Sequence, residues 1–238
     1  METWAVVPVK ERDRAKERLA PLLPPELRPV LALAMLEDVL AALAAAPGLA
    51  GIIVVTLDAG AGELARRYDA RVVTDGARDG HSGAVAAAAR LLAGEGCDGM
   101  LTLPGDVPLV TAAEIGAVIG AHRPPPSFTI VPSHDEGGSN AILLSPPDAV
   151  PLRFGVDSFF PHLRAAAAHG IVPTVLRLPG LALDIDNPAD LAAFARITSQ
   201  TGAHTRARAL LDERGLLPSL LPSRPGSAGP SPITRTYR

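Results

Sequence analysis

The stretch MLTLPGD (residues 100–106) is a short apolar run that ends in a proline, a glycine and a carboxylate. A run of this length that is closed by turn residues predicts a buried strand over residues 100–103, with Asp106 just beyond its end. Similar apolar runs lie on both sides of it, and segments with helical periodicity separate them. This alternation predicts an α/β domain with a mostly parallel sheet.

The same patterns predict further elements on both sides of this stretch. Strands are expected at residues 4–8, 51–57, 71–74, 128–131, 141–144 and about 172–177. Helices are expected at about residues 24–46, 61–68, 82–93, 157–169 and 205–216, and after Thr111 and Asn187. Ser82 is placed to cap its helix, and Thr111 with Glu114 has the spacing of a capping box. The strand at 141–144 is expected to run antiparallel, because the connection before it is brief.

The character of the chain changes towards its C-terminal end. We divide the chain into one domain over residues 1–198, a C-terminal helical extension over residues 199–217 and a tail over residues 218–238. The tail consists largely of Pro, Ser, Gly and Arg and offers little apolar surface to bury. We therefore expect it to be disordered.

The composition is that of a globular protein with a large aliphatic core. Hydrophobic residues make up 47% of the 238 residues, and aromatic residues only 3%. The net charge of −3 does not indicate the excess of positive charge that is typical of proteins that bind nucleic acid or an acidic membrane. A secretory signal pattern and an apolar run of the ~18 residues that a membrane span needs are both missing, which predicts a cytoplasmic protein. With Cys97 as its single cysteine, the sequence has no disulfide framework.

The loop after the first strand is rich in positive charge. It contains Pro8, Val9, Lys10, Lys16 and Arg18, together with two further arginines. Lys10 and Lys16 are the only lysines of the sequence. Because ligands of an open parallel sheet bind at the carboxyl ends of its strands, the loop is placed to bind a polyphosphate. Three acids interrupt the basic residues, so a solvated charged loop is the alternative.

Three carboxylates lie at predicted strand ends. Asp106 is framed by a glycine and two prolines, and Asp184 and Asp186 stand two apart, so that both point to one side with Ile185 turned into the core. Like charges this close repel unless a cation lies between them, and Mg²⁺ prefers oxygen ligands. The set is typical of two-metal phosphoryl or nucleotidyl transfer. The alternatives are a turn aspartate at Asp106 and a helix-supporting role for Asp186.

Two further segments carry weaker signals. The glycine turn at residues 137–140 favours a plain hairpin turn. Residues 154–159 (FGVDSF) lead into a helix whose N-terminus can bind an anion, although Asp157 or Ser158 as an ordinary N-cap explains the same residues. The histidines show no metal-ligand spacing, and we interpret them as structural or exposed. The exception is His162, one turn after Ser158, whose role is left open.

These segments, in this order, resemble the guanylyltransferases CofC and FbiD, which act in the biosynthesis of the deazaflavin coenzyme F-420. The matching pieces are residues 8–10, 15–19, 104–108, 138–141, 154–159, 162 and 184–188. The resemblance spans about residues 4–196. Its specific parts are the Phe-Gly-x-Asp-Ser-Phe and Asp-x-Asp-Asn-Pro segments, whereas Pro-Gly-Asp-x-Pro is shared with many nucleotidyltransferases.

The resemblance implies a fold and a reaction. The fold would be a three-layer α/β sandwich of the nucleotide-diphospho-sugar transferase (GT-A-like) type. The enzyme would couple GTP to a phosphorylated three-carbon acid and release diphosphate. The acid would be phosphoenolpyruvate, 2-phospho-L-lactate or 3-phosphoglycerate, and the guanylylated product would pass to the next enzyme of the pathway.

The roles of the family's residues carry over by position. Asp106, Asp184 and Asp186 would hold Mg²⁺, with two ions expected, and Asp106 and Lys16 would be catalytic. The acid would be held by Asn140, Gly155 and Ser158. The nucleotide would be bound by Pro8, Val9, Lys10, Lys16 and Arg18, with Gly80 and Ser82. The sequence departs from the family at residues 80–82, which read Gly-His-Ser where family members tend to read Gly-Leu-Asn.

Two other classes of function are alternatives. One is a molybdopterin or sugar-phosphate nucleotidyltransferase, but the first loop lacks the glycine-rich pattern expected there. The other is a non-catalytic nucleotide-binding protein of the same fold. Such a protein would be expected to have lost one of the three aspartates or both early lysines, and this chain keeps all five.

Overall fold

A computed structural model describes residues 2–11, 16–155 and 157–221 of the chain. Its centre is a seven-stranded sheet with the order β3-β2-β1-β4-β6-β5-β7. The strands are β1 (Thr3–Pro8), β2 (Leu49–Val55), β3 (Arg71–Val73), β4 (Gly99–Thr102), β5 (Ser127–Pro132), β6 (Ser139–Ser145) and β7 (Thr174–Val175). β6 runs antiparallel to both of its neighbours, and the other pairings are parallel. The predicted, mostly parallel sheet is confirmed.

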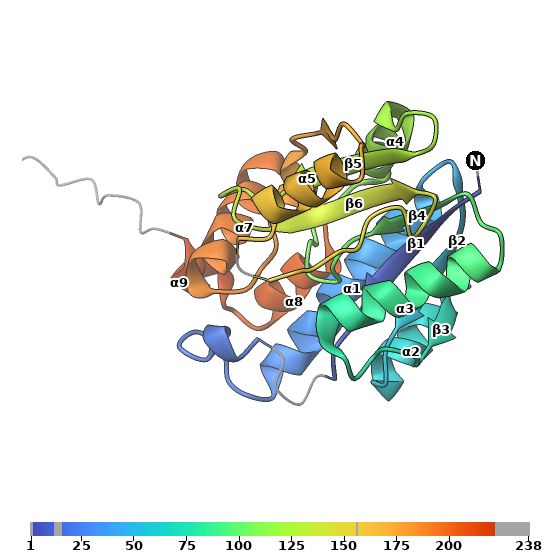
Figure 1. The fold of residues 1–238 in the computed structure, drawn as a ribbon. Helices are drawn as coiled ribbons and strands as arrows, with labels where there is room; N and C mark the ends of the chain where they lie inside the picture. Colours follow the sequence, from blue (N-terminus) through green and yellow to red (C-terminus); the bar gives the residue numbers. More distant parts are fainter. Residues whose placement is uncertain (1, 12–15, 156, 222–238) are drawn as a thin grey trace, which may run out of the picture.

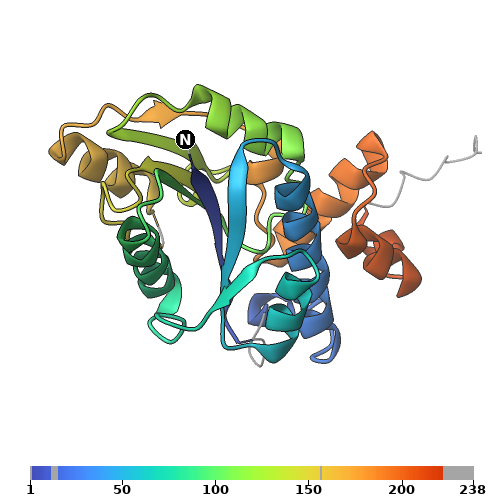
Figure 2. The same cartoon turned by 90° about the vertical axis from the view of Figure 1, so that its right-hand side faces the viewer.

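Helices cover both faces of this sheet. They are η2 (Glu17–Leu19), α1 (Leu27–Ala45), α2 (Ala59–Arg66), α3 (Gly80–Gly94), α4 (Ala112–Ala121), α5 (Phe159–Ala168), α6 (Pro179–Ala182), α7 (Pro188–Thr201), α8 (Arg206–Glu213) and α9 (Leu217–Leu220). Figures 1 and 2 show α1 and α2 on one face and α3 on the other. Successive residues of β1 point to opposite faces of the sheet, so that Val7 packs with α1 and Val6 packs with α3. The three-layer sandwich is thus as expected.

The strand directions bring several loops to one edge of the sheet. β1 and β4 pair in parallel, with Val6 opposite Thr102, so the loops that follow them leave side by side. β6 pairs antiparallel to β4, with Ile142 opposite Thr102. The first residues of β6, Ser139 and Asn140, therefore lie at the same edge as the segment that begins after Thr102.

The helix caps confirm part of the prediction and correct another part. Thr111 and Asn187 each begin a helix with a complete capping box, as expected for Thr111 from its spacing. Ser82 does not cap α3, because the helix begins two residues earlier at Gly80, after Asp79. The expected start of α5 at Asp157 is also wrong: Asp157 has a φ of 56°, which a right-handed helix excludes, and the helix begins at Phe159.

The C-terminal helices pack against the domain. α7 continues past residue 198 to Thr201, and Leu217 and Leu220 of α9 are buried, so the first residues of the expected tail are folded. Residues 222–238 lie outside the described part. Within that part, no helix has both the length and the apolar character that crossing a membrane requires.

α8 is fixed to α1 by a buried carboxylate. Asp38 of α1 accepts hydrogen bonds from the N–H groups of Arg206 (2.7 Å) and Ala207 (3.0 Å) at the start of α8. Thr205 caps the same helix end through the N–H of Arg208. The carboxylate thus satisfies N–H groups that lack a partner within the helix, across 168 positions of sequence.

We predict that Asp38→Ala lowers the free energy of unfolding by about 1–3 kcal/mol, because the N–H groups at the start of α8 lose their acceptor. Chemical denaturation followed by circular dichroism measures the change. Asp212→Ala, an exposed change on the same helix, is the matched control and should leave stability unchanged. Equal stability of the two variants would contradict the docking role of Asp38.

Candidate active site

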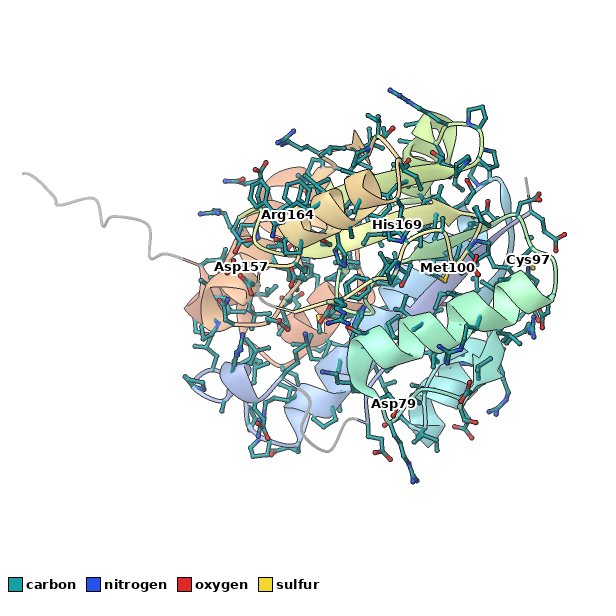
Figure 3. The ribbon with its side chains drawn as sticks, in the orientation of Figure 1. Asp79, Cys97, Met100, Asp157, Arg164 and His169 are labelled. Atoms are coloured by element: carbon teal, nitrogen blue, oxygen red, sulfur yellow. The ribbon has the colours of Figure 1, made fainter. Side chains whose placement is uncertain are left out.

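A cleft of about 1160 Å³ opens where β1 and β4 end. The residues predicted for the site all line it: Pro8, Val9, Lys10, Lys16, Arg18, Gly80, Ser82, Asp106, Asn140, Gly155, Ser158, Asp184 and Asp186. Asp79 and Asp157 line it too, and Figure 3 places them at the N-terminal ends of α3 and α5. Residues 12–15, which contain the other two arginines of the basic loop, lie outside the described residues.

The ammonium group of Lys16 joins two of the predicted carboxylates. Its Nζ atom lies 2.5 Å from Oδ2 of Asp106 and 2.8 Å from Oδ1 of Asp186. Burial of the side chain opposes its charge, but the two carboxylates outweigh this effect and raise the pKa of Lys16. Burial also opposes the charge of Asp186, yet Lys16 holds the pKa of that carboxyl below its usual range. Lys16 and Asp186 are therefore charged together at neutral pH.

Asp184 is the third carboxylate of this cluster, and its surroundings disfavour its negative charge. Burial raises the pKa of its carboxyl, and the negative charges of Asp106 and Asp186 raise it further. A hydrogen bond of 3.1 Å from Nδ2 of Asn140 acts in the opposite direction. Ile185 between the two carboxylates is fully buried, as the alternation predicted. The carboxylates thus share one side of the segment and repel one another.

Backbone hydrogen bonds hold the carboxylate segment in place. The N–H of Ile185 donates to the carbonyl of Asp106 (3.0 Å). The side chain of Asp190, from the first turn of α7, accepts from the N–H groups of Asp186 (2.9 Å) and Asn187 (3.0 Å). Two segments that are distant in sequence are thereby fixed to each other.

The chemistry of this set fits a divalent cation that substrate phosphates help to hold. Oδ1 of Asp106 is buried and has no hydrogen-bond partner among the described residues. In that same part of the chain, no three His, Cys, Asp or Glu side chains converge closely enough to form a complete metal cage. Mg²⁺ is commonly bound by one or two carboxylates plus substrate phosphates and water. The assignment of Asp106, Asp184 and Asp186 as its ligands stays a prediction.

A second, uncharged group of side chains lies around the start of α5. Oγ of Ser139 is 2.9 Å from Nδ1 of His162 and 3.5 Å from Oγ of Ser158. The N–H of Phe159 donates to the carbonyl of Gly137 (3.3 Å), which connects α5 to the glycine turn. This turn is the hairpin connection that was expected between β5 and β6, and it also lines the cleft.

The side-chain amide of Asn140 makes hydrogen bonds to other residues of the protein. Nδ2 donates one hydrogen bond to the carbonyl of Leu181 (2.9 Å) and one to Oδ1 of Asp184 (3.1 Å). An amide nitrogen has two hydrogens, so Nδ2 has none left for an anionic ligand. In this arrangement Asn140 orients Asp184, and its predicted contact with the acid stays untested.

Sequence reasoning missed the contribution of His81. Its ring packs against Phe154 with 4.4 Å between centroids, and both residues line the cleft. Burial lowers the pKa of His81 to about 4, so the ring is neutral at pH 7. Ser82 supports the same contact, because its Oγ accepts from the N–H of Phe154 (2.9 Å). The sequence did carry one signal for this contact, the departure from the family pattern at residues 80–82. It gave no indication that His81 lies next to Phe154.

The chain matches the family described as "Guanylyl transferase CofC like" over residues 3–213. A phosphoenolpyruvate guanylyltransferase of Conexibacter woesei is 37% identical over 215 residues, which cover 90% of this chain and 96% of the relative. A 3-phospho-D-glycerate guanylyltransferase of Colwellia psychrerythraea is 35% identical over 199 residues, which cover 84% and 94%.

Solved structures share the fold. A crystal structure described as a nucleotide-diphospho-sugar transferase of Desulfovibrio desulfuricans G20 has a TM-score of 0.72 at 18% identity, covering 94% of this chain and 100% of that one. A nucleotidyl transferase from Methanothermobacter thermautotroptrophicus has a TM-score of 0.59 at 22% identity, covering 84% and 99%. The fold is therefore the predicted nucleotide-diphospho-sugar transferase type.

The matched region contains the whole cleft, from Pro8 to Asp190. It also contains every segment on which the resemblance was based. The relatives are aligned over nearly their full length, so the likeness is not confined to a shared nucleotide-binding half. The chain belongs to the CofC-like guanylyl transferase family and is a nucleotidyltransferase.

Proposed function

We propose that this protein transfers a guanylyl group from GTP to the phosphate of a phosphorylated three-carbon acid and releases diphosphate. The observation that carries the proposal is the cluster of Lys16, Asp106 and Asp186 in a cleft that also contains uncharged serine hydroxyls. Two relatives are named for such acids, phosphoenolpyruvate and 3-phospho-D-glycerate. Further relatives named for phosphoenolpyruvate favour that acid over 2-phospho-L-lactate, and the guanylylated product would enter coenzyme F-420 biosynthesis.

The bond changes of this transfer are simple. An oxygen of the acid's phosphate forms a bond to the α-phosphorus of GTP. The bond from that phosphorus to the oxygen bridging to the β-phosphate breaks, and diphosphate leaves with the electron pair. Because the attacking phosphate is already ionised at pH 7, no general base is required. The main obstacle is repulsion between two anions, which positive charge and fixed orientation reduce.

The residues of the cleft are suited to reducing this repulsion. Lys10, Lys16 and Arg18 supply positive charge beside the carboxylate cluster. Asp106, Asp184 and Asp186 would hold Mg²⁺, which when bound neutralises phosphate charge. Lys16 keeps Asp106 and Asp186 oriented towards the same point. Binding and orientation of two anions are thus the main tasks of this chain's own side chains.

The proposal predicts diphosphate release when the protein is incubated with GTP, Mg²⁺ and phosphoenolpyruvate. 3-Phosphoglycerate and 2-phospho-L-lactate are tested in parallel, and ATP and CTP replace GTP to measure base preference. The expected result is turnover with GTP and at least one of these acids. Release only with a sugar phosphate or a molybdopterin would instead favour the alternative nucleotidyltransferase.

Asp106→Asn should lower kcat at least ~100-fold, by analogy with the loss of one electrostatic stabiliser of a transition state. The substitution keeps the size of the side chain but removes the charge that faces Lys16. Steady-state diphosphate release measures the effect, and Asp212→Asn on exposed α8 is the matched control. Near-normal turnover of the Asp106→Asn variant would exclude Asp106 as a metal ligand.

Lys16→Ala should weaken GTP binding while leaving the affinity for the acid largely unchanged. The reason is that the change removes positive charge from the predicted phosphate-binding loop and leaves Asp106 and Asp186 without their shared partner. Separate KM values for GTP and for the acid measure the two effects. Equal losses for both substrates, or for neither, would contradict this role.

A further inference from the structure

His162 is a buried residue that adjoins the cleft without lining it. Its side chain is only 2% exposed, and both ring nitrogens have partners. Nε2 accepts a hydrogen bond from the backbone N–H of Arg153 (3.1 Å), and Nδ1 lies 2.9 Å from Oγ of Ser139. Unlike His162, Ser139 does line the cleft. The imidazole therefore connects the loop before α5 to a hydroxyl group on the cleft wall.

The partners of the ring determine where its proton lies. A backbone N–H can only donate, so Nε2 must be the unprotonated nitrogen that accepts from Arg153. A neutral imidazole then carries its hydrogen on Nδ1, which must donate to Oγ of Ser139. Burial, reinforced by the nearby His81, lowers the pKa of His162 to about 4, which preserves this neutral form at pH 7. A charged ring would direct a second N–H at the N–H of Arg153.

This donation fixes the roles of the two neighbouring serines. Oγ of Ser139 receives the Nδ1 hydrogen, so the hydroxyl hydrogen of Ser139 is directed away from the ring. The hydroxyl of Ser158 donates to Oγ of Ser139, at an Oγ–Oγ distance of 3.5 Å. Oγ of Ser139 therefore accepts from both His162 and Ser158, and its own hydroxyl hydrogen is left over. Because Ser139 lines the cleft, that hydrogen is available to a ligand there.

Some other polar hydrogens of this region are already used. Both side-chain hydrogens of Asn140 are bonded within the protein, and the N–H of Phe159 donates to Gly137. Pro161, in the first turn of α5, has no N–H at all. The hydroxyl of Ser139 is thus a hydrogen-bond donor that remains for an anion in this part of the cleft.

We propose that Ser139 is a further binding residue for the anionic acid substrate, and that His162 is the positioning residue that directs the serine hydroxyls towards it. This inference rests on the proposed function, because it assigns an occupant to the uncharged part of the same cleft. The ligand is an anion carrying phosphate or carboxylate oxygens, which accept hydrogen bonds from hydroxyl groups. The ring of Phe154 packs edge-on against His162 with 5.1 Å between centroids and shields it from the cleft.

Two substitutions at His162 separate its two hydrogen bonds. His162→Asn places an amide near the position of Nδ1 and can still donate to Ser139, whereas His162→Gln places its amide near Nε2 and leaves Ser139 without a donor. We expect His162→Gln and Ser139→Ala to raise the KM for the acid about tenfold or more, the effect of one hydrogen bond to a charged group. The KM for GTP should not change, and His162→Asn should retain most of the affinity for the acid.

The matched control is His169→Gln at the opposite end of α5, where the side chain is exposed (Figure 3). It should leave both KM values unchanged. Thermal unfolding of each variant identifies loss of fold, and Ser139→Ala provides a second route if His162→Gln is unstable. Equal KM values for the acid in His162→Gln, His162→Asn and the unmodified protein would overturn the positioning role. An unchanged KM in Ser139→Ala would overturn the binding role.

The proton position can be measured without any substrate. Ring ¹⁵N chemical shifts of histidine-labelled protein, assigned by comparison with His162→Asn, should show His162 neutral at pH 7 with its hydrogen on Nδ1. A hydrogen on Nε2 would contradict the donation to Ser139 and overturn the inference.

Calorimetry separates the failure of this inference from the failure of the proposed function. Phosphoenolpyruvate, 3-phosphoglycerate and 2-phospho-L-lactate are titrated into the full chain with Mg²⁺ and a GTP analogue that resists cleavage after the α-phosphorus. Binding by the unmodified protein that weakens about tenfold in Ser139→Ala would support both conclusions. Equal binding by both proteins would overturn only the inference, and binding of no acid by the unmodified protein would overturn both.

Discussion

The arrangement of the cleft depends on one ammonium group held between two carboxylates. Lys16 reaches Asp106 across 90 positions of sequence and Asp186 across 170. Three partly buried aspartates would repel one another without a cation, and burial together with the charges of Asp106 and Asp186 raises the pKa of Asp184. Lys16 therefore compensates part of the negative charge that the fold gathers at this site.

The sheet topology explains why these residues meet. β1 and β4 are adjacent and parallel, so the basic loop and Asp106 leave the sheet at one edge, and antiparallel β6 begins at that edge with Ser139 and Asn140. The hydrophobic layers on the two faces stabilise this frame without contributing chemistry. Ligand binding beyond the carboxyl ends of parallel strands is the general consequence of such a sheet.

The cleft combines two kinds of environment. Around Lys16 the interactions are ionic, which suits phosphates and a divalent cation, whereas around His162 they are neutral hydrogen bonds with defined directions. Charge is effective at neutralising a polyphosphate, and directed hydroxyls are effective at distinguishing one small anion from another. The contact of Phe154 with both His81 and His162 joins the start of α3 to the loop before α5.

The sequence by itself determined the alternation of strands and helices, the position of Asp106 after a buried strand and the pairing of Asp184 with Asp186 around buried Ile185. These features follow from local periodicity and turn chemistry, which a single sequence records. Only the tertiary structure decided that Lys16 bridges the aspartates, that the side-chain amide of Asn140 donates to Asp184, and that α8 docks on Asp38. Each of these contacts joins residues far apart in the chain, and side-chain reach and hydrogen-bond direction leave no periodic trace in the sequence.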